Sequence, residues 1–195
     1  PALARGHVLV REETVNADVA PDAHVGPFVS VGARSRIESG AVVGPGCVIG
    51  DDCVVGAEHP GASHKLSARE IIEFASMWDP QPWHIDEAAA RDSHFGGLTA
   101  CSAHTFSIFC ITSQRWQSGV VQQAIAGLGF DEMRMHRPVY AGDTLRCTSI
   151  VDAARVSRSK PDRGIVVYQT QLINQNNDVV FSIKASTLMK RDPAR

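Results

Sequence analysis

The sequence predicts an α+β protein built from two unlike parts. Between residues 19 and 56 an aliphatic residue returns every six positions, a repeat typical of stacked structural units. The run from residue 99 to about residue 116 contains no Pro or Gly and is rich in apolar residues, as expected of a buried helix. Four strand-like segments follow. We therefore expect a repeat arm over residues 1–56 and a helix-and-sheet domain over residues 57–195.

The repeat is carried by its leading positions, which are Val19, Val25, Val31, Ile37, Val43, Ile49 and Val55. The position four residues later is mostly small, and Gly often follows the aliphatic residue. This pattern resembles the hexapeptide repeat of left-handed parallel β-helices, which place three repeats in each coil. Two coils make a poor independent core. A packing or trimer-forming appendage, an acyltransferase segment, and a plain arm rich in Val and Gly are the alternatives.

The periodicity changes after a turn-rich stretch at residues 56–61. Ser67 and Glu70 form a capping box, in which the hydroxyl accepts from the amide three residues on while the Glu side chain reaches back. The helix that begins there is expected to stop at Asp79-Pro80. A second short helix is expected from Asp86.

The strand patterns cover residues 127–136, 144–156, 164–174 and 178–190. Gln175-Asn176-Asn177 separates the last two and favours a hairpin turn, because Asn tolerates positive φ. Long antiparallel strands after one buried helix predict a sheet wrapped round that helix.

The candidate chemistry lies in Trp-Asp-Pro-Gln-Pro-Trp-His-Ile-Asp, residues 78–86. Its two prolines are expected to hold the segment out of a helix, so that Asp79 and His84 can meet around one water. Gly96-Gly97 could open the long helix, whose first amides can bind an oxyanion. Taken singly, Asp79 also suits a helix stop, His84 a loop imidazole bonded to backbone, and the glycines a tight loop.

Composition narrows the classes of partner. Charged residues make up 21% of the chain and hydrophobic ones 44%, the formal net charge is −2 and the pI is near 6.5. These values give no sign of a nucleic-acid or membrane surface and favour a small-molecule partner. No segment is long and apolar enough to span a bilayer, and no secretory signal is visible, so we expect a cytoplasmic protein. Five cysteines without a C-x-x-C spacing indicate neither disulfides nor zinc.

From Asp51 onward, the sequence resembles the MaoC-like acyl dehydratases, a hotdog-fold family that includes (R)-specific enoyl-CoA hydratases. The matching pieces stand in the family's order: DDCVVGAE, LSAREIIEFASMWDPQPWHIDEAAA, HFGGLTACSAHT, RPVYAGDTL, SRSKPDRGIVVY and NQNNDVVFSIKASTLMKR. The resemblance implies an antiparallel sheet wrapped round a central helix. It also implies reversible addition of water to the α,β double bond of an enoyl-CoA thioester.

The same resemblance assigns the site. Asp79 is the implied base, and His84 orients the water and returns the proton. The implied oxyanion and substrate-binding positions are Gly96, Gly97, Leu98, Ser102 and Trp83. Ser102 stands where members commonly carry Gly, and Ala103 replaces a frequent Trp. His104 is interpreted as a buried hydrogen-bonding residue rather than a second base.

The polar segment 157–164 has two interpretations. It is either a solvated hairpin loop or a site at which Arg158, Lys160 and Arg163 meet the CoA phosphates. No metal or redox cofactor is expected, and coenzyme A enters only as part of the substrate. An acyl carrier protein thioester remains an alternative. The resemblance implies a homodimer or a hexamer made of three dimers.

Two other functions stay open. A hotdog thioesterase would direct water at the carbonyl carbon, although the pairing of Asp79 with His84 argues against it. A non-catalytic acyl-CoA-binding or assembly subunit is the second, and the departures at Ser102 and Ala103 favour it.

Overall fold

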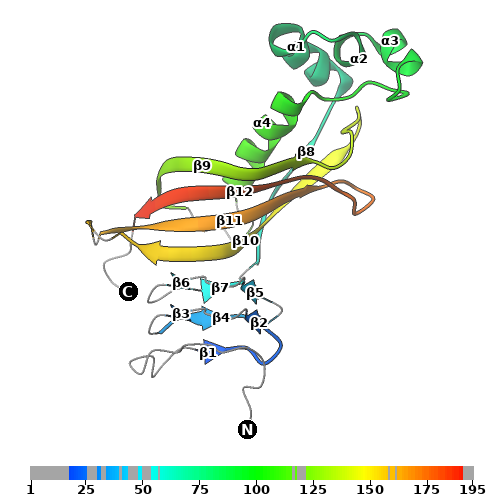
Figure 1. Cartoon of the computed structure of the whole chain (residues 1–195). Helices are drawn as coiled ribbons and strands as arrows, with labels where there is room; N and C mark the ends of the chain where they lie inside the picture. Colours follow the sequence, from blue (N-terminus) through cyan, green and yellow to red (C-terminus); the bar gives the residue numbers. More distant parts are fainter. Residues whose placement is uncertain are drawn as a thin grey trace.

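The computed structural model of the 195-residue chain describes residues 18–25, 30–31, 34–39, 41–43, 48–49, 54–56, 58–115, 117, 122–157, 159–160 and 162–190. Helix α4 (Ser102–Ser113) lies against a large antiparallel sheet, and three shorter helices form a cap beyond one end of that sheet (Figure 1). The short strands of the N-terminal part are stacked on the other side of the sheet from this cap.

The sheet has five strands in the order β8-β10-β11-β12-β9. Their bounds are β8 Glu58–Lys65, β9 Ala124–Met135, β10 Thr144–Val156, β11 Arg163–Ile173 and β12 Val179–Lys190. All neighbouring pairs are antiparallel. The four predicted strands are confirmed to within a few residues, and Asn177 adopts φ 64° in the predicted hairpin turn. The predicted α+β class is therefore confirmed.

Strand β8 was not expected, because Pro60 and Gly61 suggested only a turn. The chain instead runs extended here at the edge of the sheet, where a proline that lacks an N–H is tolerated. A Cβ on Gly61 would lie 2.7 Å from the Thr112 carbonyl oxygen and 2.9 Å from the Cys147 Cβ. This glycine is required by the close passage of β8 over the end of α4.

The core lies between α4 and the sheet. Ile108 and Phe109 of α4 pack in the same cluster as Leu145, Leu172 and Phe181, each of which is fully buried in the sheet. The helix begins three residues later than predicted, because Thr99 forms an isolated bridge with Tyr140 and the Ala100 amide donates to Val139. It ends at Ser113, about three residues before the predicted end near Trp116.

The cap begins with α1 (Ala68–Trp78), for which Ser67 is the N-cap. The Ser67 hydroxyl accepts from the Glu70 amide at 3.2 Å, as predicted. The Glu70 carboxylate does not complete the box, since its Oε1 lies 2.8 Å from His64 Nε2. An imidazole at the end of β8 thus takes the place of the Ser67 amide.

The segment after α1 was expected to stay extended, and this expectation was wrong for its second half. Pro82–Ile85 forms a single helical turn, α2, with Pro82 at a first-turn position where a missing N–H costs nothing. Helix α3 (Glu87–Asp92) then starts at Asp86, whose Oδ1 accepts from the Ala88 and Ala89 amides at 2.7 and 3.0 Å. These bonds, the one from Ala89 foremost, lower the pKa of Asp86.

The N-terminal part consists of two-residue strands that pair in parallel. They are β1 Asp18–Val19, β2 His24–Val25, β3 Ser30–Val31, β4 Arg36–Ile37, β5 Val42–Val43, β6 Val48–Ile49 and β7 Val54–Val55. Each pairs with a strand 18 residues away, which is three steps of six. Val31, Ile37 and Val55 are buried inside this stack.

The stack is joined directly to the sheet. Strands β6 and β7 lie against β10, and the Gly56 amide donates to the Val151 carbonyl at 3.1 Å. Gly56 has φ +88°, and a Cβ there would meet the Ala41 Cβ at 2.4 Å. The junction therefore requires glycine both for its backbone angle and for space.

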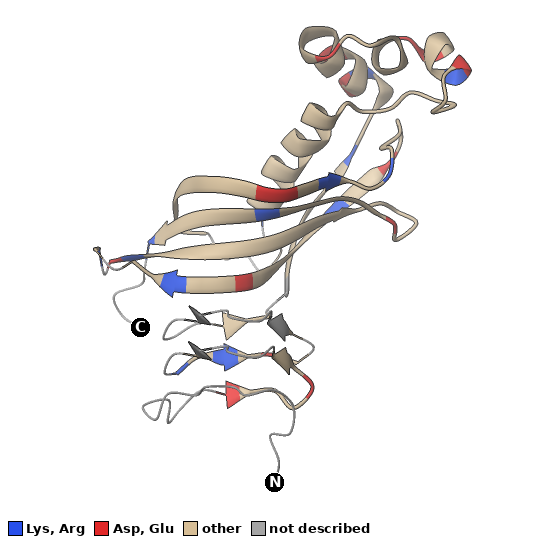
Figure 2. Cartoon of the chain, in the orientation of Figure 1, with Lys and Arg blue, Asp and Glu red and all other residues tan. Residues whose placement is uncertain are grey.

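Basic and acidic residues are both scattered over the described elements (Figure 2). Among the described residues, no helix combines the length and apolar character that a membrane span requires. The cysteines within the described ranges, Cys101, Cys110 and Cys147, are free thiols.

Candidate active site

Asp79 and His84 are brought together by two consecutive turns. Asp79 is the C-cap of α1, and its amide donates to the Ala75 carbonyl at 2.9 Å. The helix ends here because the residue before a proline disfavours helical angles. The Gln81 amide then donates to the Asp79 carbonyl and the His84 amide to the Gln81 carbonyl, each at 2.8 Å. This path carries His84 back towards Asp79.

The two side chains lie at the distance of a shared water. Asp79 Oδ2 is 4.0 Å from His84 Nε2, which is beyond the range of a direct hydrogen bond. A water about 2.8 Å from both atoms fits this separation. The imidazole is 9% exposed and the carboxylate 40% exposed, so the carboxylate side of the pair is open to solvent.

His84 is held by bonds at both ring nitrogens. Its Nδ1 lies 2.7 Å from the Thr99 carbonyl oxygen, which can only accept, so Nδ1 carries a proton. Thr99 Oγ1 lies 3.3 Å from the same nitrogen. The Trp83 indole Nε1–H donates to Nε2 at 3.1 Å. The neutral ring therefore presents its only lone pair at Nε2, on the side of Asp79.

The start of α4 lies close to this pair in the chain and in space. Thr99, which binds His84, is three residues before the helix, and the N-cap Cys101 makes no side-chain hydrogen bond to the first turn. The first amides of a helix have no intrahelical acceptor. Ser102 and Ala103 are exposed residues, and a helix start of this kind favours a negatively charged oxygen.

Gly96, Gly97 and Leu98, which were predicted to bind the oxyanion or the substrate, lie in a loop and in the core. Gly96, with φ +67°, and Gly97 lie in the loop before the Thr99 bridge and do not open α4. Tyr140 donates its hydroxyl proton to the Phe95 carbonyl at 3.0 Å and lies beside Gly97. Leu98 is 7% exposed and belongs to the core cluster. Its side chain packs, while its neighbour Thr99 supplies the contact to His84.

A second group of titratable residues lies between α1 and α4. His64 Nε2 and His104 Nε2 approach the same oxygen of Glu70, at 2.8 and 3.5 Å. The Phe74 ring stacks on His104 with centroids 4.3 Å apart and planes 5° apart. His104 is buried as predicted, and burial lowers its pKa, while Glu70 opposes that shift. Its Nδ1 has no hydrogen-bond partner within the described residues.

This group borders a groove of about 350 Å³. His64, Glu70 and Glu73 form its polar border, and Phe74, Ile108 and Ile111 form its apolar wall. The groove runs along α4 from His104, which lies in the same helical turn as Ser102. An acyl group whose carbonyl met the first amides of α4 would therefore find apolar surface one turn further along the helix.

Lys160 and Arg163 lie at the opposite end of the sheet from Asp79. They follow β10, whose 13 residues span about 40 Å from the Tyr140 loop. Arg163 is paired with Asp162 at 2.8 Å, and Lys160 is exposed. Arg158 lies outside the described residues. The structure does not bring this loop to the dyad within one chain.

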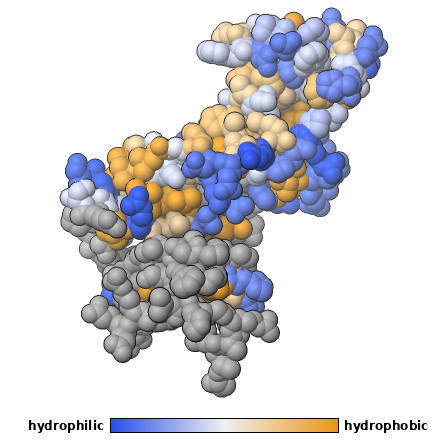
Figure 3. Space-filling model, in the orientation of Figure 1, coloured by the Kyte–Doolittle hydropathy of each residue, from blue (hydrophilic) through white to orange (hydrophobic). Residues whose placement is uncertain are grey.

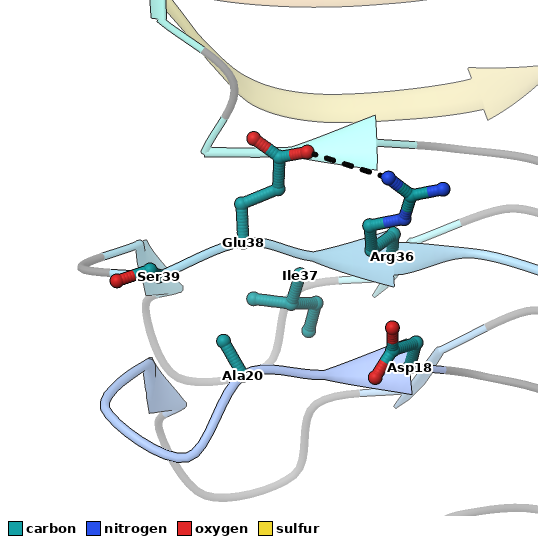
Figure 4. Close-up of a pocket in the computed structure, with 6 residues that line it drawn as sticks. All are labelled: Asp18, Ala20, Arg36, Ile37, Glu38 and Ser39. Carbon is teal, nitrogen blue, oxygen red and sulfur yellow. Dashed lines mark ion pairs between the residues drawn. The ribbon is translucent and has the colours of Figure 1, made fainter.

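Another hollow lies in the N-terminal stack. Asp18, Ala20, Arg36, Ile37, Glu38 and Ser39 line a pocket of about 310 Å³ there (Figure 4). Arg36 and Glu38 form a mostly exposed ion pair at 3.8 Å, which is of a kind that contributes little. Within the described parts of the chain, no three His, Cys, Asp or Glu side chains are grouped as metal ligands.

Two contributors were missed by sequence reasoning. Thr99 contacts His84 through its backbone carbonyl. Every residue has such a carbonyl, so the type of side chain at position 99 gives no signal. Glu70 was assigned only to a helix cap, yet it joins His64 and His104. The imidazole of His64, six residues before Glu70, was the one available hint.

The family follows from comparison with known proteins. A family model described as the FAS1-like dehydratase domain region matches residues 53–183. The chain belongs to this family. The uncharacterized protein YdeM of Bacillus subtilis is 32% identical over 130 residues, which are 66% of this chain and 89% of that protein.

A solved structure supports the hotdog fold of this dehydratase-family chain. The MaoC-like dehydratase from Rhodospirillum rubrum is 38% identical with a TM-score of 0.64, over 71% of this chain and 94% of that one. The mesaconyl-CoA hydratase of Cereibacter sphaeroides is 31% identical over 99 residues, 50% of this chain but 29% of that enzyme. The chain thus spans under a third of that hydratase. The comparisons establish a MaoC-like hydratase/dehydratase family for residues 53–183.

Proposed function

We propose that this protein reversibly adds water to the α,β double bond of an enoyl-CoA thioester, with Asp79 and His84 holding that water. The observation that carries the proposal is the 4.0 Å separation of Asp79 Oδ2 and His84 Nε2, close to the uncapped start of α4. Membership of a hydratase/dehydratase family supports the class of reaction.

The reaction needs a proton acceptor for water, a proton donor for the α-carbon and donors aimed at the thioester oxygen. The thioester carbonyl withdraws electrons, so the β-carbon accepts the water oxygen while negative charge gathers on the carbonyl oxygen. One proton of the water passes to the dyad, and the dyad returns a proton to the α-carbon. Oxygen and hydrogen from one water thus end on neighbouring carbons.

The hydrogen bonds of His84 determine whether its ring can take the proton of the reacting water. Since Nδ1–H donates to Thr99, Nε2 has a lone pair and can accept from water. The Asp79 carboxylate oxygens can accept from the same water. The proton taken from water belongs to the pair, and assigning it to one member requires measurement.

The amides at the start of α4 are the proposed oxyanion donors. Ser102 supplies the first helical N–H, and the residue is exposed. The proposal requires that the serine that replaces the family's common glycine leaves this amide available. The groove beside Phe74, Ile108 and Ile111 is the proposed place of the acyl group.

A homodimer is the proposed assembly. Strand β9 is at the edge of the sheet and exposes Ile125, Leu128, Phe130, Met133 and Met135. Figure 3 shows apolar residues gathered over the sheet, between the more polar helical cap and the N-terminal stack. A long apolar edge strand is an aggregation hazard unless another strand or chain covers it. Pairing of β9 with its copy would cover it.

Crotonyl-CoA distinguishes the three candidate functions. Loss of the enone absorbance without release of free thiol indicates hydration, the expected result. Free thiol indicates the alternative of a thioesterase. Saturable binding without either change, and the same binding by Asp79→Asn, would instead indicate a non-catalytic acyl-CoA-binding subunit.

A further inference from the structure

The indole of Trp83 occupies the atom of His84 that the proposed reaction needs. A neutral imidazole has one donor and one acceptor nitrogen. The donor, Nδ1, is committed to the Thr99 carbonyl at 2.7 Å. The acceptor, Nε2, receives the Trp83 Nε1–H at 3.1 Å. Because indole nitrogen only donates, the direction of this bond is unambiguous.

The geometry of the two rings agrees with a hydrogen bond along the lone pair. Their centroids are 5.9 Å apart and their planes meet at 71°, so the indole approaches edge-on rather than stacking. A water shared with Asp79 would have to donate to the same lone pair, since Asp79 Oδ2 is 4.0 Å from Nε2. One sp² nitrogen offers one lone pair, so indole and water compete for it.

We propose that Trp83 is a gating residue, which caps His84 Nε2 in the ligand-free protein and must turn away before the catalytic water can bind. This inference rests on the proposed hydration reaction. It assigns Trp83 a role in controlling the access of the water to His84, instead of a role in lining the acyl pocket.

The surroundings allow the side chain to move while the backbone stays. The Trp83 carbonyl accepts from the Thr99 amide at 3.4 Å, and α2 holds the residue within its helical turn. Beyond the indole lie His94 and Phe95, with centroids 6.1 and 6.2 Å from it. The indole is half-buried, so rotation about its side-chain bonds can break the contact to Nε2 without unfolding the cap.

Protonation would keep the gate open during turnover. Once Nε2 has taken a proton from water, it can no longer accept from the indole N–H, and two donors would face each other. The indole can return only after that proton has passed to the α-carbon. The contact is therefore compatible with the resting ring and incompatible with the protonated one.

Trp83→Phe tests the proposal, since it keeps a ring of similar shape and removes the N–H. We expect kcat/KM for crotonyl-CoA to rise about three- to tenfold, the factor that corresponds to the net free energy of one hydrogen bond between neutral groups. Trp78→Phe is the matched control, because Trp78 is another tryptophan of the cap, lies five residues before Trp83 and is 68% exposed. It should leave kcat/KM unchanged. An unchanged or lower kcat/KM in Trp83→Phe would overturn the gate.

Nitrogen NMR of the whole protein tests the contact independently of activity. In the wild type, the His84 Nε2 resonance should be that of an unprotonated, hydrogen-bonded nitrogen and should shift in Trp83→Phe. Butyryl-CoA, which has no double bond to hydrate, should abolish that difference by displacing the indole. An Nε2 resonance that is the same in both proteins overturns the gate, even if hydration is observed. Absence of hydration with the Nε2 shift present would refute the proposed function while leaving the capping contact established.

Discussion

Asp79 Oδ2 and His84 Nε2 lie 4.0 Å apart, although Asp79 caps the end of α1 and His84 lies in α2, with two prolines between them in the chain. The separation is too long for a direct bond and short enough for one water to bridge. Because Thr99 fixes the proton on Nδ1, the lone pair of His84 lies on the side of the carboxylate. The proposed reaction rests on this relationship more than on either residue alone.

The Ser102 amide can be removed without removing the helix. Proline is favoured at the first position of a helix, and Cys101 already has φ −71° and ψ 163°, which suit a residue before proline. If this amide binds the oxyanion, Ser102→Pro should lower kcat for crotonyl-CoA about 100-fold or more. Steady-state kinetics measure this.

Ser102→Ala is the control for that change, because it keeps the amide and loses only the hydroxyl. We expect its kcat to stay within about threefold of the wild-type value, well short of the loss seen on removing an oxyanion donor. Equal rates in the Pro and Ala variants would show that the oxyanion is bound elsewhere.

His104 should make folding stability depend on pH. Burial lowers its pKa below the ordinary value of about 6.5, so the unfolded chain binds a proton more readily than the folded one. The stability that the fold has with a neutral His104 is complete above pH 6.5. It is lost as the pH falls towards the pKa of His104 in the folded state. In that window the free energy of unfolding decreases by up to about 1.4 kcal/mol per pH unit.

His104→Phe removes this titration and keeps a ring to stack on Phe74. Urea unfolding at pH 7.5 and pH 5.5 should show a smaller loss of stability in the variant than in the wild type. His59, whose pKa burial also lowers, remains in both proteins and accounts for part of the common loss. An identical loss in the two proteins would contradict the assignment to His104.

Strand β9 should form the dimer. Leu128 is 51% exposed on that strand, and an arginine in its place would bring a charge into the proposed interface. Light scattering should show Leu128→Arg shifted towards the monomer. Ile150→Arg, at a site 42% exposed on β10, should keep the wild-type mass. If each of the two variants is still a dimer, the interface lies elsewhere.

The sheet could be predicted from sequence because its strands have clear period-two patterns and turn residues between them. Strand β8 could not, since Pro60 and Gly61 suit either a turn or an edge strand, and only the neighbour β10 decides. Helix α4 starts later than predicted because Thr99 pairs with Tyr140, which lies 41 residues further along the chain. Such pairing is tertiary and leaves no local signal.

The site was predicted in part. Asp79 and His84 were chosen by residue type and by resemblance, and the structure places them together. The expected extended loop was wrong because Pro82 is equally compatible with the first turn of a helix. The bonds that orient His84 come from a carbonyl 15 residues away and from an adjacent indole. Neither is encoded in the spacing of the motif.

The most direct measurement is the rate of crotonyl-CoA hydration by the wild type, by Asp79→Asn and by Asp92→Asn. Asp92 is an exposed carboxylate at the end of α3 and serves as the matched control. If Asp79 and His84 share the reacting water, Asp79→Asn should lower kcat about 100- to 10,000-fold, while Asp92→Asn keeps the wild-type rate. Hydration by Asp79→Asn at the wild-type rate would contradict this mechanism.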